Sequence, residues 1–184
     1  KRLSSGEMLQ IERSFKKSMS EEIYFRMVKD KTASLISTSC ELGVITTSKD
    51  EDHKTAARDY GENLGVAFQI KDDLLDITGL EREVGKPTMF DLKKNMLTLP
   101  IIHILSTQDK TERKQLISDL KYLSKKNKKK KIKSMIIEMG GVEYAEKKIA
   151  ELSDNAKREL DIFDDNESKS ALISAINFNI ERKS

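Results

Sequence analysis

A mostly apolar stretch at residues 61–79 (GENLGVAFQIKDDLLDITG) carries its polar side chains in one narrow pattern. Gln69, Asp72, Asp73 and Asp76 stand at positions i, i+3, i+4 and i+7. Side chains with that spacing share one face of an α-helix. The stretch therefore predicts a long helix, from about residue 50 to residue 78, with an amide and three carboxylates in a stripe among aliphatic side chains.

The acidic stripe has two interpretations. Three carboxylates within two helical turns repel one another, weakly in water and more strongly when they are partly buried. Solvent on the polar face of an amphipathic helix would relieve this repulsion weakly. Divalent cations would relieve it strongly, and a ligand set made only of oxygen suits Mg²⁺, which binds one or two carboxylates together with substrate phosphates. The apolar flanks favour the metal site over the solvated face.

The composition indicates an all-α chain. With two Pro, no Trp and long helix-forming runs, the 184 residues suit a single helical domain. The 34 basic and 31 acidic residues leave a net charge of +3, which gives no reason to expect a nucleic-acid partner. No apolar run reaches the roughly 18 residues of a membrane span. The single cysteine, Cys40, excludes an internal disulfide and fits a reducing compartment, so we expect a cytoplasmic protein.

Basic residues lie in two places that suit an anionic ligand. Lys31 and Thr32 fall within a predicted helix at about Glu21–Val44, among small residues that allow close approach. Residues 79–98 form a predicted loop that follows the acidic stripe and carries several lysines, among them Lys86. Lysines on one side of a diphosphate and metal-binding carboxylates on the other would neutralise it. The alternative for Lys31 is tight helix packing, with its ammonium group in solvent.

The segment KKNKKKKIK at residues 125–133 is a basic run. We expect it to be a solvated helix end or loop. Attraction to an anionic membrane surface is a looser interpretation, worth about 1 kcal/mol per lysine near such lipid. Nucleic-acid binding is less favoured because no aromatic residues are interleaved. The run therefore predicts at most peripheral membrane contact.

Three segments, in this order, resemble the trans-isoprenyl diphosphate synthases: KTASL, FQIKDDLLDITG and GK-x4-DL-x5-TLP. Further likeness runs from GEMLQ at Gly6 to MGGVEYAEKKI near Ile149, so the resemblance covers most of the chain. It is nearest to the long-chain, octaprenyl-type polyprenyl branch. The resemblance implies an all-α, isoprenoid synthase-type helical bundle around a central cavity. There, Mg²⁺ ions bridge two aspartate-rich motifs and the diphosphate of an allylic substrate.

The resemblance also implies roles by position. The residues implied in catalysis are Lys31, Thr32, Gln69, Asp72 and Asp73. Those implied in binding the substrate diphosphate are Lys31 and Lys86, and those implied in binding Mg²⁺ are Asp72, Asp73, Asp76 and Asp91. Asp72 is the expected direct ligand. Gly6, Glu7 and Gln10 resemble a wall of the substrate cavity.

The implied reaction is prenyl transfer. An allylic C–O bond ionises only when the leaving diphosphate is neutralised, which Mg²⁺ and lysines would do. Apolar neighbours such as Leu64, Phe68 and Leu75 would keep the resulting cation from water. Isopentenyl diphosphate would then attack through its double bond and lose a proton. The product would be an all-trans polyprenyl diphosphate, and no protein nucleophile is needed.

Two departures from the family bear on activity. The chain contains no second DDxxD, and the family's first aspartate-rich motif lies upstream of the Lys-Thr pair. We therefore expect residues 1–184 to be the C-terminal portion of a single polyprenyl synthase domain, without its N-terminal helices. Met96 stands where the family usually has a lysine, so either Lys93 or Lys94 substitutes for it or one diphosphate contact is lost.

Three other functions compete with the enzyme. A non-catalytic partner subunit would bind and tune a complete synthase, but it would have no need to keep Lys31, Gln69 and the DDxxD. A terpene cyclase would more usually carry an Asn/Ser/Glu metal motif. A helical interaction domain with a solvated acidic face is the simplest alternative. By analogy with the family, the full-length protein is expected to be a homodimer that binds an allylic diphosphate and isopentenyl diphosphate.

Overall fold

The computed structural model describes residues 1–16, 19–79 and 88–183, and these residues form only helices and their connections. The predicted all-α fold is therefore confirmed. The elements are α1 (Arg2–Lys16), α2 (Glu21–Val28), the π-helical turn η1 (Lys29–Ala33), α3 (Ser34–Ile45), α4 (Glu51–Thr78), α6 (Phe90–Lys93), α7 (Leu99–Ser106), α8 (Lys110–Lys125), α9 (Lys129–Glu138), α10 (Gly141–Glu159) and α11 (Glu167–Glu181).

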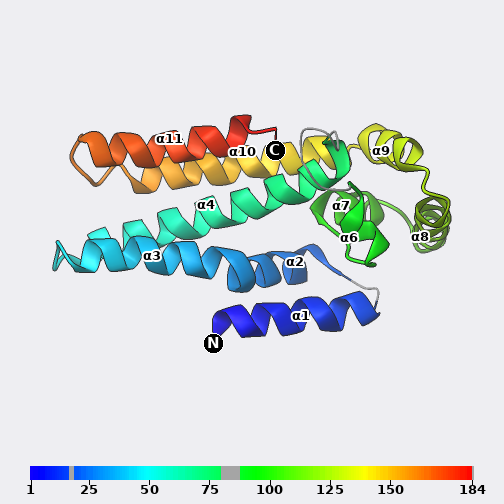
Figure 1. Ribbon diagram of the computed structural model, residues 1–184, viewed down its shortest axis with the longest axis horizontal. Helices are drawn as coiled ribbons and strands as arrows, with labels where there is room; N and C mark the ends of the chain where they lie inside the picture. The colour runs from blue at the N-terminus through cyan, green and yellow to red at the C-terminus, as the bar shows by residue number, and fades with distance from the viewer. Residues whose placement is uncertain (17–18, 80–87, 184) are drawn as a thin grey trace.

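The longest helix, α4, is the centre of the arrangement (Figure 1). Helix α3 runs antiparallel beside it, and α10 packs along another side, with α11 folded back against α10. Helix α1 lies against α2 and η1. The C-terminal end of α4 contacts α2, α6 and α7, so the acidic stripe lies where elements distant in sequence converge.

Helix starts follow local sequence signals. The hydroxyl of Ser20 accepts the amide of Ile23 and caps α2, as the sequence predicts. Asp50 caps α4 through the amide of Asp52. Thr98 stands at the N-cap of α7, but its side chain makes no capping hydrogen bond.

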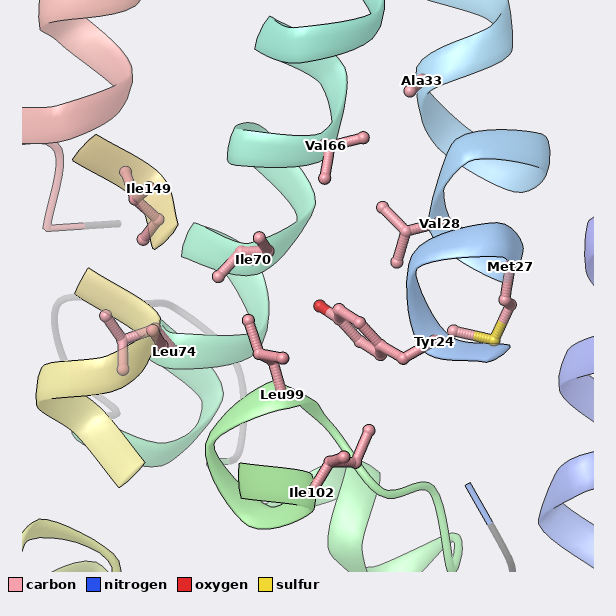
Figure 2. Close-up of a cluster of buried hydrophobic side chains, with 11 residues drawn as sticks. Tyr24, Met27, Val28, Ala33, Val66, Ile70, Leu74, Leu99, Ile102 and Ile149 are labelled. Atoms are coloured by element: carbon pink, nitrogen blue, oxygen red, sulfur yellow. The ribbon is translucent and has the colours of Figure 1, made fainter. Parts of the chain in front are cut away.

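One hydrophobic cluster supports the end of α4 that carries the stripe. Figure 2 shows Ile70 and Leu74 of α4 beside Leu99 of α7, with the side chain of Tyr24 extending from α2 toward them. These four side chains are at most 3% exposed. Burial of a large aliphatic side chain stabilises a fold by about 1.5–3 kcal/mol. The cluster therefore holds the acidic face of α4 rigidly against α2.

The predicted helix at Glu21–Val44 is present but is interrupted by η1. Its five residues, Lys29–Ala33, form a π-helical turn, which contains one residue more than an α-helical turn. Lys31 and Thr32 lie in this turn. The predicted loop at 79–98 also needs correction, because its described part contains the short helix α6. Met89, which precedes α6, has a left-handed backbone with φ of 59°.

The basic run lies at the far end of the molecule, in the last residues of α8, the turn after it and the start of α9 (Figure 1). Most of its lysines are exposed, as expected for a solvated helix end. Lys133 is an exception, because its ammonium group donates to the carbonyl of Thr78 at 2.5 Å. Within residues 1–16, 19–79 and 88–183, no helix is both long and apolar enough to cross a membrane.

Candidate active site

A cavity of about 220 Å³ lies between α1, η1, the end of α4 and the segment that contains α6. Seven of the eight predicted site residues line it: Lys31, Thr32, Gln69, Asp72, Asp73, Asp76 and Asp91. The eighth, Lys86, lies outside the described residues. Gln10, which the resemblance places in a cavity wall, also lines it. The acidic stripe therefore lines a partly open cavity.

Asp73 is a buried carboxylate whose two oxygens both accept hydrogen bonds from side chains. One of its oxygens, Oδ2, accepts the hydroxyl of Tyr24 at 2.6 Å, and the other, Oδ1, accepts the amide Nε2 of Gln69 at 2.9 Å. The Oε1 of Gln69 in turn accepts the hydroxyl of Thr32 at 2.9 Å. Burial raises the pKa of Asp73 to about 7, against the hydrogen bonds from Tyr24 and Gln69, which favour the charged form. Both oxygens of Asp73 are thus held by protein donors.

Asp76 organises the backbone that follows α4. Its Oδ1 accepts the amide of Phe90 at 3.1 Å, and its Oδ2 accepts the amide of Asp91 at 3.3 Å. These are the first amides of α6, which lacks a side-chain cap of its own at Met89. Asp76 is 5% exposed. Although it lies 14 residues before Phe90, its carboxylate caps α6 by accepting these two amides. This contact places Asp91 at the cavity.

Asp72 is the most open of the three stripe carboxylates, with its side chain 32% exposed. Its Oδ1 lies 2.6 Å from Nη2 of Arg182, in the C-terminal residues after α11. The guanidinium group also donates to the carbonyl of Phe68 and lies 4.2 Å from the centre of the Phe68 ring. Among the described residues, Oδ2 of Asp72 has no hydrogen-bond partner.

The cationic side of the cavity comes from η1 and α1. The ammonium of Lys31 donates to Oε1 of Gln10 at 2.7 Å, and the amide of Gln10 contacts the sulfur of Met96 at 3.0 Å. Arg13 also lines the cavity, and its buried Nε has no hydrogen-bond partner in the part of the chain that the structure describes. A buried donor without a partner is costly, and an anionic ligand would satisfy it.

The two lysines expected as substitutes at Met96 do not reach the cavity. Lys93 and Lys94 are both exposed, and neither belongs to its lining. The ammonium of Lys94 lies 4.2 Å from the ring centre of Phe90 instead. Among the described residues, Arg13 could take the role of the lysine that the family usually has at position 96, because Arg13 lines the cavity together with Met96.

Three residues at the site were missed by sequence reasoning: Tyr24, Arg13 and Arg182. Tyr24 stands among apolar residues of α2 and is typical of a core side chain. Arg13 lies three residues after Gln10, so the helical spacing of the two was a signal that both face the same cavity. Arg182 is separated from Asp72 by the whole of the second half of the chain, and no local pattern joins them.

Of the three stripe carboxylates, Asp72 is the most open to a metal ion. The described residues contain no group of three or more His, Cys, Asp or Glu side chains arranged to hold a metal by themselves. Within the described residues, Oδ2 of Asp72 has no partner, whereas both oxygens of Asp73 and of Asp76 accept hydrogen bonds. A single carboxylate that acts together with substrate phosphates fits Mg²⁺, which uses few protein ligands.

Sequence comparisons agree with the geometry. A family model described as polyprenyl synthetase matches residues 1–139. The geranylgeranyl diphosphate synthase of Saccharolobus solfataricus is 34% identical over 184 residues, which cover 98% of this chain and 55% of that protein. The heptaprenyl diphosphate synthase component 2 of Bacillus subtilis is 40% identical over 100 residues, which cover 54% of this chain and 29% of that protein.

Solved structures have the same fold. A polyprenyl synthase from Caulobacter crescentus, in complex with calcium and isoprenyl diphosphate, superposes with a TM-score of 0.86 at 29% identity, covering 100% of this chain and 56% of that one. The chain thus spans about half the length of the relatives it matches over its whole length. With a family model over most of its residues and the aspartates, Lys31 and Thr32 around one cavity, the chain belongs to the polyprenyl synthetase family.

Proposed function

We propose that the protein containing this chain is a prenyltransferase that condenses isopentenyl diphosphate with an allylic diphosphate to give an all-trans polyprenyl diphosphate. One observation carries the proposal: carboxylates of α4 and the ammonium of Lys31 line the same cavity. A diphosphate bound there would meet Lys31 directly and Asp72 through Mg²⁺. Neutralising the leaving diphosphate is what ionisation of an allylic C–O bond requires.

The residues of this chain would act as follows. Lys31 and Arg13 would bind diphosphate oxygens, and Asp72 would hold Mg²⁺, which as a Lewis acid stabilises the departing charge. The C–O bond breaks with its electron pair on the diphosphate, and the hydroxyl oxygen of Thr32 would face the allylic cation. The double bond of isopentenyl diphosphate then forms the new C–C bond, and a proton is lost to the released diphosphate.

The finer form of the proposal is a long-chain, octaprenyl-type product. The 40% identity to a heptaprenyl diphosphate synthase component supports long products, whereas the similarity to geranylgeranyl diphosphate synthases supports shorter ones. We expect a homodimer in the cytoplasm. The name of the Bacillus subtilis relative, heptaprenyl diphosphate synthase component 2, also points to a second candidate function, in which this chain is a subunit of a two-component synthase.

The test is isoprenyl transfer from labelled isopentenyl diphosphate to farnesyl diphosphate with Mg²⁺. It should be run with this chain alone and with the protein encoded by the gene's complete coding sequence. We expect product from the complete protein, and none after Asp72→Ala or after chelation of Mg²⁺. Asp59→Ala, on the solvent side of the same helix, is the matched control and should leave activity intact.

Each outcome has a distinct meaning. The length of the product, read by chromatography, identifies the branch. No product from the complete protein would overturn the enzyme proposal. Activity that returns only on addition of a second protein from the same organism would instead support the two-component assembly.

A further inference from the structure

Tyr24 is a buried polar residue that the proposed chemistry does not use. Its side chain is 0% exposed, and it lies between Val28 and Leu99 in the core cluster (Figure 2). Its hydroxyl donates to Oδ2 of Asp73 at 2.6 Å. A phenylalanine would fill the same space without a polar atom to satisfy, so packing alone gives no reason for the hydroxyl.

The Tyr24 hydroxyl is the first member of a chain of hydrogen bonds that ends at the cavity. Asp73 accepts from Tyr24 on one oxygen and from Nε2 of Gln69 on the other. An ionised carboxylate can only accept, so Gln69 must turn its NH₂ group to Asp73 and its carbonyl oxygen away. That carbonyl oxygen accepts the hydroxyl proton of Thr32 at 2.9 Å.

The polarity of this chain decides what Thr32 offers to a ligand. Because the Thr32 proton is committed to Gln69, the hydroxyl oxygen presents lone pairs, and Thr32 lines the cavity. Hydrogen bonds in series polarise one another, so the negative charge of Asp73 increases the electron density on the Thr32 oxygen. An electron-rich oxygen stabilises a developing cation, whereas a hydroxyl turned proton-first would repel it.

We propose that Tyr24 is a positioning residue for prenyl transfer: it fixes Asp73, and through Asp73 and Gln69 it orients the hydroxyl of Thr32 with its oxygen toward the reacting allylic group. The inference rests on the proposed function. Tyr24 lies at the edge of the cavity but is 0% exposed, so we assign it no direct contact with substrate. Its contribution is to hold the Asp73 carboxylate in the one rotamer that receives Gln69.

The chain offers a matched control in Tyr60. This tyrosine is also buried, at 1% exposure, and its hydroxyl also donates one hydrogen bond, to the carbonyl of Leu172 at 2.9 Å. It belongs to a separate hydrophobic cluster and does not line the cavity. Tyr24→Phe and Tyr60→Phe therefore each remove one buried hydroxyl, and only the first is connected to Thr32.

The experiment measures steady-state prenyl transfer by the complete protein in mildly alkaline buffer, for Tyr24→Phe, Tyr60→Phe, Thr32→Val and the double variant Tyr24→Phe with Thr32→Val. We expect Tyr24→Phe to lower kcat about tenfold and to change KM for the allylic diphosphate less than about twofold. Tyr60→Phe should leave kcat unchanged. The double variant should be no slower than Thr32→Val alone, because the two changes break one chain.

Two results would overturn the inference. One is a kcat of Tyr24→Phe equal to that of Tyr60→Phe, and the other is losses from Tyr24→Phe and Thr32→Val that multiply. Thermal melting of each variant identifies a fold defect. Such a defect would lower the fraction of active protein, and the resulting loss of activity would be the same whether or not Thr32 is also replaced. If the unmodified complete protein forms no prenyl product, the proposed function fails. If that protein is active and Tyr24→Phe leaves its kcat unchanged, only the inference about Tyr24 fails.

Discussion

Replacing Gly65 by alanine tests the close contact between α4 and the π-helical turn. A Cβ built on Gly65 would lie 2.6 Å from Cα of Ala33 and 2.8 Å from its Cβ. Ordinary van der Waals contact begins at 3.4 Å. These two nearest atoms are a backbone Cα and the Cβ attached to it, so neither can move without the backbone of Ala33. Helix α4 and the turn must separate by about 1 Å or bend.

The expected cost follows from two opposing terms. Overpacking of this kind costs about 1–3 kcal/mol, and contact with backbone places Gly65→Ala at the upper end. Alanine recovers about 1 kcal/mol of helix propensity in the middle of α4. The net loss is about 2 kcal/mol, which lowers Tm by about 4–8 °C in a chain of this size.

Gly43→Ala is the matched control, because a Cβ on Gly43, in α3, meets nothing within 4 Å. It should keep the propensity gain and raise the free energy of unfolding by up to about 1 kcal/mol. Urea unfolding followed by circular dichroism compares the two. A Gly65→Ala protein as stable as Gly43→Ala would refute the reasoning. Because Lys31 and Thr32 lie in the displaced turn, Gly65→Ala should also lower kcat.

Three further predictions concern charged groups. Arg13→Gln should raise KM for the diphosphate substrates about tenfold, since it removes a cavity cation whose buried Nε has no partner among the described residues; unchanged KM would contradict this. Arg182→Gln should lower the Mn²⁺ concentration for half-saturation, by electron paramagnetic resonance, about threefold, because it frees Asp72 from a competing cation. Burial raises the pKa of Glu62, but the ion pairs with Lys29 and Arg2 outweigh burial and hold this pKa below the ordinary value of a glutamate. Glu62→Gln should therefore lower the free energy of unfolding above the ordinary glutamate pKa, and this free energy should fall less steeply as the pH drops through the lower folded pKa.

The sequence predicted the parts of the site that depend on one helix. The spacing of Gln69, Asp72, Asp73 and Asp76 is a property of α4 alone, and it was enough to place them on one face. Caps such as Ser20 are equally local, because donor and acceptor lie three residues apart. Periodicity and capping are short-range physics, so a single sequence reveals them.

Contacts between distant segments could not be predicted in this way. Tyr24 and Asp73 are 49 residues apart in the sequence. Their hydrogen bond forms only because α2 and α4 pack against each other in a way that brings these two side chains together. The π-helical turn at Lys29–Ala33 depends on that same packing, since its sequence is compatible with an α-helix. Arg182 reaches Asp72 only after α10 and α11 have folded back along α4. The two side-chain contacts and the π-helical turn all depend on how distant segments pack, and the local sequence pattern does not indicate that packing.

The repulsion among the stripe carboxylates is offset by protein groups that the sequence did not suggest. Tyr24 and Gln69 hold Asp73, backbone amides hold Asp76, and Arg182 holds Asp72. The protein's own donors thus offset part of the charge, and we expect α4 to stay folded without Mg²⁺.

Removal of the metal should therefore leave the fold in place. We expect the complete protein to show Tm values within about 2 °C with Mg²⁺ and with a chelator, because a weakly bound ion adds little by mass action. Prenyl transfer should nevertheless cease in the chelator. A fall in Tm of about 10 °C or more on chelation would show that the carboxylates depend on the metal for the fold itself, and would contradict the roles assigned to Tyr24, Gln69 and Arg182 as counter-groups.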